Sequence, residues 1–258
     1  MTEEPNKTVD NESIESQSKD VGLLFLANFV HQVVNPLNGV IGTLHNITDD
    51  VYGPAVVKQK INASRAQLEQ CVTLIRNLAY LSDFFFETSE KTVLRNTREG
   101  ATSILPQTII ESLQFFQVSA DKKKIRFELT DPITQYRISA RPELLKQIFL
   151  NLFDNWLKYG KRDQIIEITP TVNKKNDLVV SISGASIGFD NADADRIFEM
   201  GYRSKEAEGK VAQGSGIGLF ICREIAEKVL GGGIKAVHSS KNNNTTFTLV
   251  IPPRIWKI

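Results

Sequence analysis

The sequence is poor in cysteine, balanced in charge and free of long apolar runs, and each of these features excludes a class of protein. Two cysteines among 258 residues are too few for a disulfide-stabilised secreted fold. Lys plus Arg total 31 against 30 Asp plus Glu, so no charge surplus predicts a nucleic-acid partner. No apolar run reaches the ~18 residues that a membrane span needs, and the first residues lack the pattern of a signal peptide. We therefore predict a soluble, cytoplasmic protein without membrane insertion, with Cys71 and Cys222 buried in helices.

The composition changes along the chain and divides it into four regions. Residues 1–20 are acidic and polar, which predicts a disordered tail. Residues 21–88 carry two long amphipathic helical patterns around a Gly-Pro turn. Residues 89–103 are charged and rich in hydroxyl groups, which is typical of a linker, and residues 104–258 mix helix and strand patterns. The fold class is therefore α+β, with a helical hairpin followed by an α/β sandwich.

In the hairpin region, apolar residues recur at alternating steps of three and four, as in a heptad seam. The first seam is Leu23, Leu26, Val30, Val33, Leu37, Val40, Leu44 and Ile47, and the second is Val57, Ile61, Ser64, Leu68, Cys71, Ile75, Leu78, Ser82 and Phe85. A single hairpin would leave much of this stripe in water. We therefore expect the hairpin to form a homodimer with a four-helix bundle.

The C-terminal region alternates helix and strand signals. Pro106 and Pro142 are placed to open helices, one through about Ser119 and one through Lys158. A third helix is expected at 218–230. Strands are expected near 124–130, 165–169, 178–183, 234–238 and 245–251.

His31 is the candidate nucleophile of the hairpin. Pro36 follows five residues later and cannot donate the backbone hydrogen bond of its turn, so a bend is expected that exposes the His31 ring. A neutral imidazole near pH 7 is a competent nucleophile. His45 and His238 lack a comparable Asn-Pro motif, and we expect neither to react.

Two motifs of the C-terminal region point to a triphosphate site. Asn151 and Asn155 are one turn apart and share a helix face. Gly214, Gly216 and Gly218 lead directly into a helix, where glycines let backbone amides approach phosphate oxygens. A dinucleotide fold could use such a glycine triplet, but no strand directly precedes it here.

Taken together, these motifs and their order over residues 20–252 resemble the two-component sensor histidine kinases, with a GHKL (Bergerat) ATPase domain. The resemblance implies ATP-dependent autophosphorylation of His31 and phosphotransfer to a response regulator. It implies that Asn151 and Asn155 hold Mg²⁺ and that the nucleotide contacts include Lys158, Tyr159, Gly184, Lys205, Gly214, Gly216, Gly218 and Leu219.

Three residues depart from the pattern of the resembling family: Gln32, Ile182 and Ser186, the last of which replaces a second glycine. The acidic residue that usually follows the histidine is Gln32, which cannot act as a base. The Asp that accepts the adenine amino group is replaced by Ile182, unless Ser183 takes its role. Asn35 matches a position that orients water for dephosphorylation of the partner. Two hypotheses stay open: an active histidine kinase with an atypical adenine pocket, or a degenerate relative that binds or dephosphorylates a response regulator.

Overall fold

The computed structural model describes Val30 and residues 33–86, 101–205 and 216–258. The chain forms two compact units, Met1–Glu87 and Thr88–Ile258. Among the described helices, none combines the length and the apolar composition needed to cross a bilayer.

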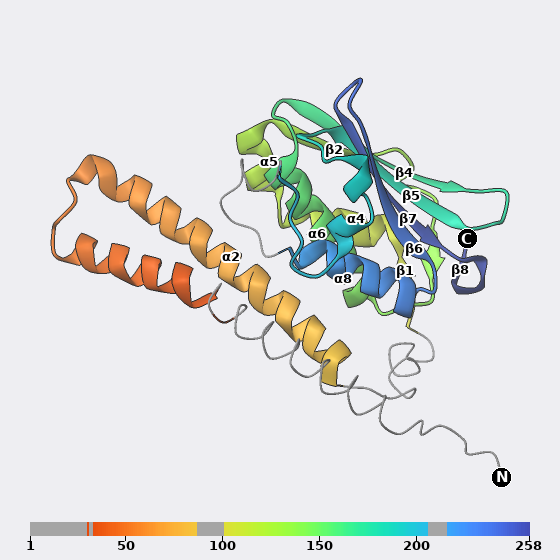
Figure 1. Ribbon diagram of the computed structural model, residues 1–258, viewed down its shortest axis with the longest axis horizontal. Helices are drawn as coiled ribbons and strands as arrows, with labels where there is room; N and C mark the ends of the chain where they lie inside the picture. Colours follow the sequence, from red (N-terminus) through yellow and green to blue (C-terminus); the bar gives the residue numbers. More distant parts are fainter. Residues whose placement is uncertain (1–29, 31–32, 87–100, 206–215) are drawn as a thin grey trace, which may run out of the picture. The chain divides into compact units, whose positions relative to one another are not determined.

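The N-terminal unit is a helical hairpin (Figure 1). A first helix over residues 33–48 is followed by a short turn and by α2, Pro54–Phe86. Val40, Ser64 and Cys71 are buried between the two helices, and the Cys71 thiol lies 3.7 Å from the carbonyl oxygen of Val33. One stripe of each helix thus packs inside the hairpin.

A second apolar stripe of the hairpin is exposed. It includes Val34, Ile41, Leu44, Ile61, Leu68, Val72 and Ile75. The sequence pattern had placed Leu44, Ile61, Leu68 and Ile75 in the same seams as the buried residues, and the structure separates the two sets. The reason is geometric, because a helix in a two-helix hairpin can turn only part of a wide apolar face toward its single neighbour.

The C-terminal unit is a two-layer α/β sandwich, as predicted (Figure 1). Its five-stranded sheet has the order β2-β4-β5-β7-β6, in which only the β2–β4 pair is parallel. The bounds are Ile125–Leu129, Gln164–Val172, Leu178–Ala185, Asn244–Ile251 and Gly233–Ser239 for β2, β4, β5, β7 and β6. Buried residues alternate along β5 and β7, so one face of the sheet lies against the helices.

The helical layer contains α4 (Leu105–Gln114), α5 (Gln117–Lys123), α6 (Pro142–Tyr159) and α8 (Gly218–Glu224). Helix α6 begins with proline after the extended residue Arg141, which suits a first-turn position. Its apolar residues recur at helical spacing and are among the most buried of the chain: Leu145, Ile148, Phe149, Leu152, Phe153 and Trp156. Helix α6 is therefore the centre of the core.

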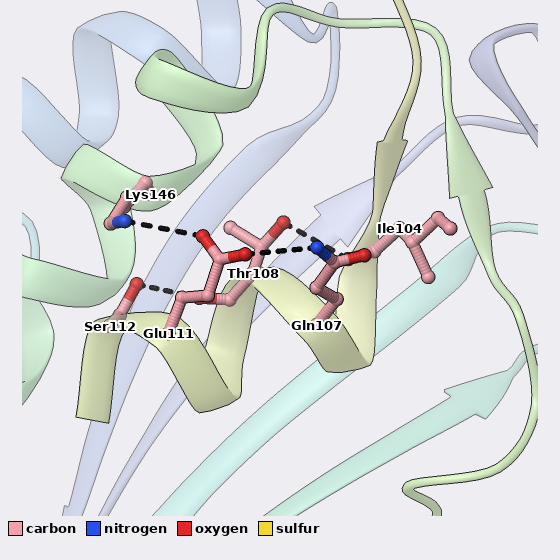
Figure 2. Close-up of polar contacts among 6 residues, drawn as sticks. All are labelled: Ile104, Gln107, Thr108, Glu111, Ser112 and Lys146. Atoms are coloured by element: carbon pink, nitrogen blue, oxygen red, sulfur yellow. Dashed lines mark hydrogen bonds and ion pairs between the residues drawn. The ribbon is translucent and has the colours of Figure 1, made fainter. Parts of the chain in front are cut away.

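Helix α4 is held against α6 by a polar chain on its surface (Figure 2). Gln107 donates to the Glu111 carboxylate over 2.9 Å, and Lys146 of α6 lies 3.2 Å from the other oxygen of that carboxylate. The hydrogen bond from Gln107 and the neighbouring Lys146 lower the pKa of Glu111. Because its pKa is lowered, the Glu111 carboxylate stays charged at lower pH than an ordinary glutamate, and so does its ion pair with Lys146.

Two helices differ from their expected form. The helix predicted from Pro106 to about Ser119 breaks at Phe115 and Phe116 into α4 and α5, and α5 ends at the left-handed Lys124. The helix predicted at 218–230 is α only to Glu224 and continues as a π-helix, Ile225–Val229. Three two-residue strands were not predicted, β1 (Ser103–Ile104), β3 (Arg137–Ile138) and β8 (Trp256–Lys257), which pair in a separate antiparallel sheet.

Candidate functional site

The asparagine cluster consists of Asn151, Asn155 and Gly218, at the meeting of α6 and α8. The Nδ2 atoms of both asparagines are buried and make no hydrogen bond of normal length to a described residue, although the Asn151 side chain neighbours the Cys222 thiol, whose pKa is raised by burial and partly lowered by this neighbour. The Oδ1 of Asn151 accepts a long hydrogen bond, 3.4 Å, from Gln147. A buried amide without a partner costs free energy in the protein alone, so two such donors on one helix face are typical of a ligand site.

Glycines lie where the chain enters α8, and one of them, Gly216, has a backbone conformation that favours glycine. A Cβ added to Gly218 would lie 3.4 Å from the Asn151 Oδ1, so the start of α8 closely approaches the amide. Gly216 has a φ of +66°, and a Cβ there would lie 2.5 Å from the backbone of Gly201. The Gly201 amide also donates to the Gly216 carbonyl over 3.0 Å. Gly218 thus lies beside Asn151 and Gly216 packs on Gly201, while Gly214 lies outside the described residues.

The other predicted nucleotide contacts lie in different surroundings. The Lys158 ammonium forms an ion pair with Asp154 one turn earlier, at 2.6 Å. The backbone carbonyl of Tyr159 accepts a hydrogen bond from the Ile187 amide over 3.0 Å. The Lys205 side chain is exposed, and Leu219 is half-buried in the first turn of α8. A role for each of them in binding nucleotide stays a prediction.

The end of β5, where the resemblance places the acceptor for the base, carries no such acceptor at Ile182 or Gly184. Ile182 is buried in the middle of the strand, opposite Ile168 and Phe247. Ser183 cannot replace it, because a shift of one residue points the side chain to the other sheet face. There the Ser183 hydroxyl lies 2.8 Å from that of Thr246. Gly184 shares the face of Ile182 and is opposite Thr245, so the strand offers no acceptor side chain toward α6 at either position.

A hydroxyl cluster that the sequence analysis did not find lies beside Gly184. It consists of Ser186, Thr245 and His238, all at most 7% exposed. The Ser186 and Thr245 hydroxyls are 2.7 Å apart, and the Thr245 Oγ1 is 2.9 Å from the His238 Nδ1. The Ser186 oxygen also accepts from the Gly188 amide. The partners come from three separate segments, so no local sequence spacing could have shown them.

On the hairpin, Asn35 is exposed on the first helix, whereas His31 and Gln32 lie outside the described residues. The two cysteines are buried, as expected, and neither forms a disulfide. Burial raises the pKa of the Cys222 thiol far above its usual range, so this thiol stays protonated.

The part of the chain that holds the asparagine cluster is similar to a known class of domain. Residues 140–255 match the family described as histidine kinase-, DNA gyrase B- and HSP90-like ATPase. The predicted GHKL-type sandwich is therefore confirmed. The four-helix bundle stays a prediction.

Within this class, the chain is similar to sensor histidine kinases. It is 25% identical over 227 residues to the sensor histidine kinase YcbM of Bacillus subtilis, across 88% of this chain and 70% of that protein. It is 29% identical over 242 residues to the aerobic respiration control sensor protein ArcB of Escherichia coli, across 93% of this chain but 30% of ArcB. Histidine kinase ThkA, solved in complex with the response regulator TrrA, has the same fold, with a TM-score of 0.61 and 20% identity over 97% of this chain and 68% of that chain. The resemblance to two-component sensor histidine kinases is thus confirmed.

The residues present fit the phosphate part of a nucleotide. The unpaired amides of Asn151 and Asn155 can donate to phosphate oxygens or, through their Oδ1 atoms, bind a hard cation. Among the described residues, no group of three or more His, Cys, Asp or Glu is placed to hold a metal ion. A Mg²⁺ ion here would therefore take its remaining ligands from phosphate and water. The fit to a base is poorer, because Ile182 and Gly184 present no acceptor.

Proposed function

We propose that this chain is the kinase part of a two-component system, which phosphorylates its own His31 from Mg²⁺·nucleotide and passes the phosphoryl group to a response regulator. The observation that carries the proposal is the pair of buried amides on one face of α6, Asn151 beside Gly218 and Asn155 one turn later. Two amide donors of this kind one turn apart on one helix face suit a ligand with oxygen acceptors. The similarity to sensor histidine kinases supports the same assignment.

The transfer itself needs a nucleophile and a leaving group. A bound Mg²⁺·ATP would supply the γ-phosphoryl group. In the step, a neutral His31 ring nitrogen forms a bond to phosphorus while the bond to the leaving nucleoside diphosphate oxygen breaks. Gln32 can orient the ring through a hydrogen bond, but it cannot take up the ring proton. Solvent then receives that proton, and we expect slow phosphorylation.

Phosphohistidine analysis tests this proposal directly. The purified chain is incubated with γ-labelled ATP and Mg²⁺, and the label should be lost in acid and retained in base. His31→Gln should abolish labelling, whereas His45→Gln, on the same helix, serves as the matched control and should keep it. Full labelling of His31→Gln would contradict the assignment. His238 is not expected to react, because its ring is buried and hydrogen-bonded to Thr245.

The hairpin supports a homodimer. Its exposed stripe places seven large apolar side chains in water, including Ile41 and Ile61, and burying them against a second copy would remove this cost. Ile41→Asp should therefore yield monomers in sedimentation, while Asn38→Asp, also exposed and one turn earlier, should stay dimeric. A dimeric Ile41→Asp variant would exclude this surface.

A degenerate relative that acts on a response regulator is the second candidate. It is favoured by the strand β5, which lacks an acceptor at both Ile182 and Gly184. Asn35 is exposed and could orient a water molecule toward a phosphorylated partner. Dephosphorylation of a phosphorylated regulator that persists in His31→Gln but is lost in Asn35→Ala would favour this function. The buried, reduced cysteines suit a cytoplasmic location for either function.

A further inference from the structure

The space beside Gly184 is filled by an aromatic ring of the protein itself. A Cβ added to Gly184 would lie 3.3 Å from the Cζ3 atom of Trp156, and 3.0–3.1 Å from atoms of Gln164 and Ile166. Trp156 is 2% exposed, and its indole packs edge to face on Phe247 with ring centroids 6.0 Å apart. The missing side chain on β5 is thus matched by a large side chain from α6, and no room is left between them.

The position of Trp156 relates this packing to the proposed nucleotide site. It directly follows Asn155 on α6, and its ring lies over the end of β5, the strand that carries the base acceptor in the resembling family. A triphosphate held by the asparagine cluster would direct its base toward this space. An indole is a planar ring system of fused five- and six-membered rings, like a purine, so Trp156 fills the volume and shape that a base would need.

Except for the indole N–H of Trp156, which is buried without a partner among the described residues, the polar groups in this region are paired within the protein. In the hydroxyl cluster, Thr245 is bonded to both Ser186 and His238. The Gln164 amide both donates to the Ala185 carbonyl and accepts from its N–H, each over 2.7 Å. The loop after β5 is tied to the end of α6 through the Tyr159 carbonyl and the Ile187 amide. The neighbouring groups that could recognise the edge of a base are therefore satisfied, and the one donor left without a partner among the described residues of this region is the indole N–H of Trp156 itself.

We propose that the Trp156 indole occupies the place of the base in this ATPase domain. The site then takes a triphosphate group and does not select the nucleoside attached to it. This inference rests on the proposed function only for the triphosphate site at Asn151 and Asn155; the closure of the base site is a property of Trp156, Gly184 and the hydroxyl cluster.

Calorimetry with the full chain and Mg²⁺ tests the selectivity. We expect ATP, GTP and inorganic tripolyphosphate to bind with affinities within about threefold of one another, a small difference in free energy. Adenosine should not bind at millimolar concentration. ATP binding at least about tenfold tighter than tripolyphosphate, or measurable adenosine binding, would overturn the proposal.

Removing the Trp156 indole, which would open the space beside Gly184, provides the converse test. Trp156→Ala should gain adenosine binding and tighten ATP by about tenfold or more, with tripolyphosphate affinity unchanged. Trp156→Phe keeps most of the ring and should gain less. If no phosphate compound binds the unmodified chain, the proposed function fails, but a gain of adenosine binding in Trp156→Ala would still support the closure. A folded alanine variant without that gain would contradict it.

Because loss of a large buried side chain can unfold a domain, a third measurement leaves Trp156 in place. The sequence has two tryptophans, and Trp256→Phe leaves Trp156 as the sole one. A base stacked against the indole would change its fluorescence. We expect ATP to change the emission no more than tripolyphosphate does. A larger change with ATP would show that the base reaches Trp156 and would overturn the inference.

Discussion

The asparagine cluster and the region around Trp156 both lie on α6, yet they are packed in different ways. Asn151 and Asn155 each keep a buried amide donor without a partner among the described residues. One residue further along, the indole of Trp156 covers Gly184, and the neighbouring hydroxyl cluster is internally paired. The indole N–H of Trp156 is also a buried donor without a partner among the described residues, so the two regions differ in packing: the space beside Gly184 is filled by a side chain of the protein itself, as in a core. The difference divides the expected nucleotide site into an open phosphate part and a closed base part.

The largest expected effect comes from a charge in the closed part. Ile182→Asp should not restore an adenine acceptor, because Ile182 is 1% exposed and lies between Ile168 and Phe247. An unpaired buried carboxylate should lower the free energy of unfolding by about 3–5 kcal/mol, which urea denaturation would measure. Ile182→Val is the matched control and should cost about 1 kcal/mol. A stable Ile182→Asp protein with tighter ATP binding would show that the base part is open.

A change in the open part should affect binding and leave stability intact. Asn155→Ala should weaken tripolyphosphate binding by about tenfold to a hundredfold, since it removes a hydrogen bond to a charged ligand. The free energy of unfolding should stay the same or rise, because a buried donor without a partner is removed. Calorimetry and urea denaturation give the two values. Asn242→Ala, in the exposed β6–β7 turn, is the control. Lost stability with unchanged binding would mean that Asn155 is structural.

The smallest effect concerns the hydroxyl cluster. Thr245→Val keeps the shape of the side chain but removes the group that links Ser186 to His238. Stability should fall by about 1–3 kcal/mol, because buried partners lose a hydrogen bond, and tripolyphosphate binding should not change. Thr248→Val, on the same strand with its side chain on the opposite face, is a control for the loss of a hydroxyl. A large loss of tripolyphosphate binding in Thr245→Val would assign the cluster to the ligand site.

Periodic features of the chain were predictable from the sequence. The pattern of α6 predicted a helix from Pro142 through Lys158, and the helix extends from Pro142 to Tyr159. The α/β sandwich and the burial of both cysteines were predicted as well. These features depend on residues close in sequence, where helical and strand periodicities directly specify which side faces the core.

Short or irregular features were not predictable in the same way. The break between α4 and α5 and the π-helix have no signal in the apolar spacing, because either form would keep the same face buried. The two-residue strands β1, β3 and β8 are too short for an alternating pattern and form only because three distant segments meet.

The sequence by itself determined the order of the units, the main helices and strands, and the presence of Asn151, Asn155 and the glycines at the spacing of a triphosphate site. Only the tertiary structure decided which side chains share a space. The contact of Trp156 with Gly184 joins a helix to a strand 28 positions later, and the hydroxyl cluster joins residues up to 59 positions apart. Such contacts depend on the strand register and the packing of α6 on the sheet, and a local pattern carries no information about either.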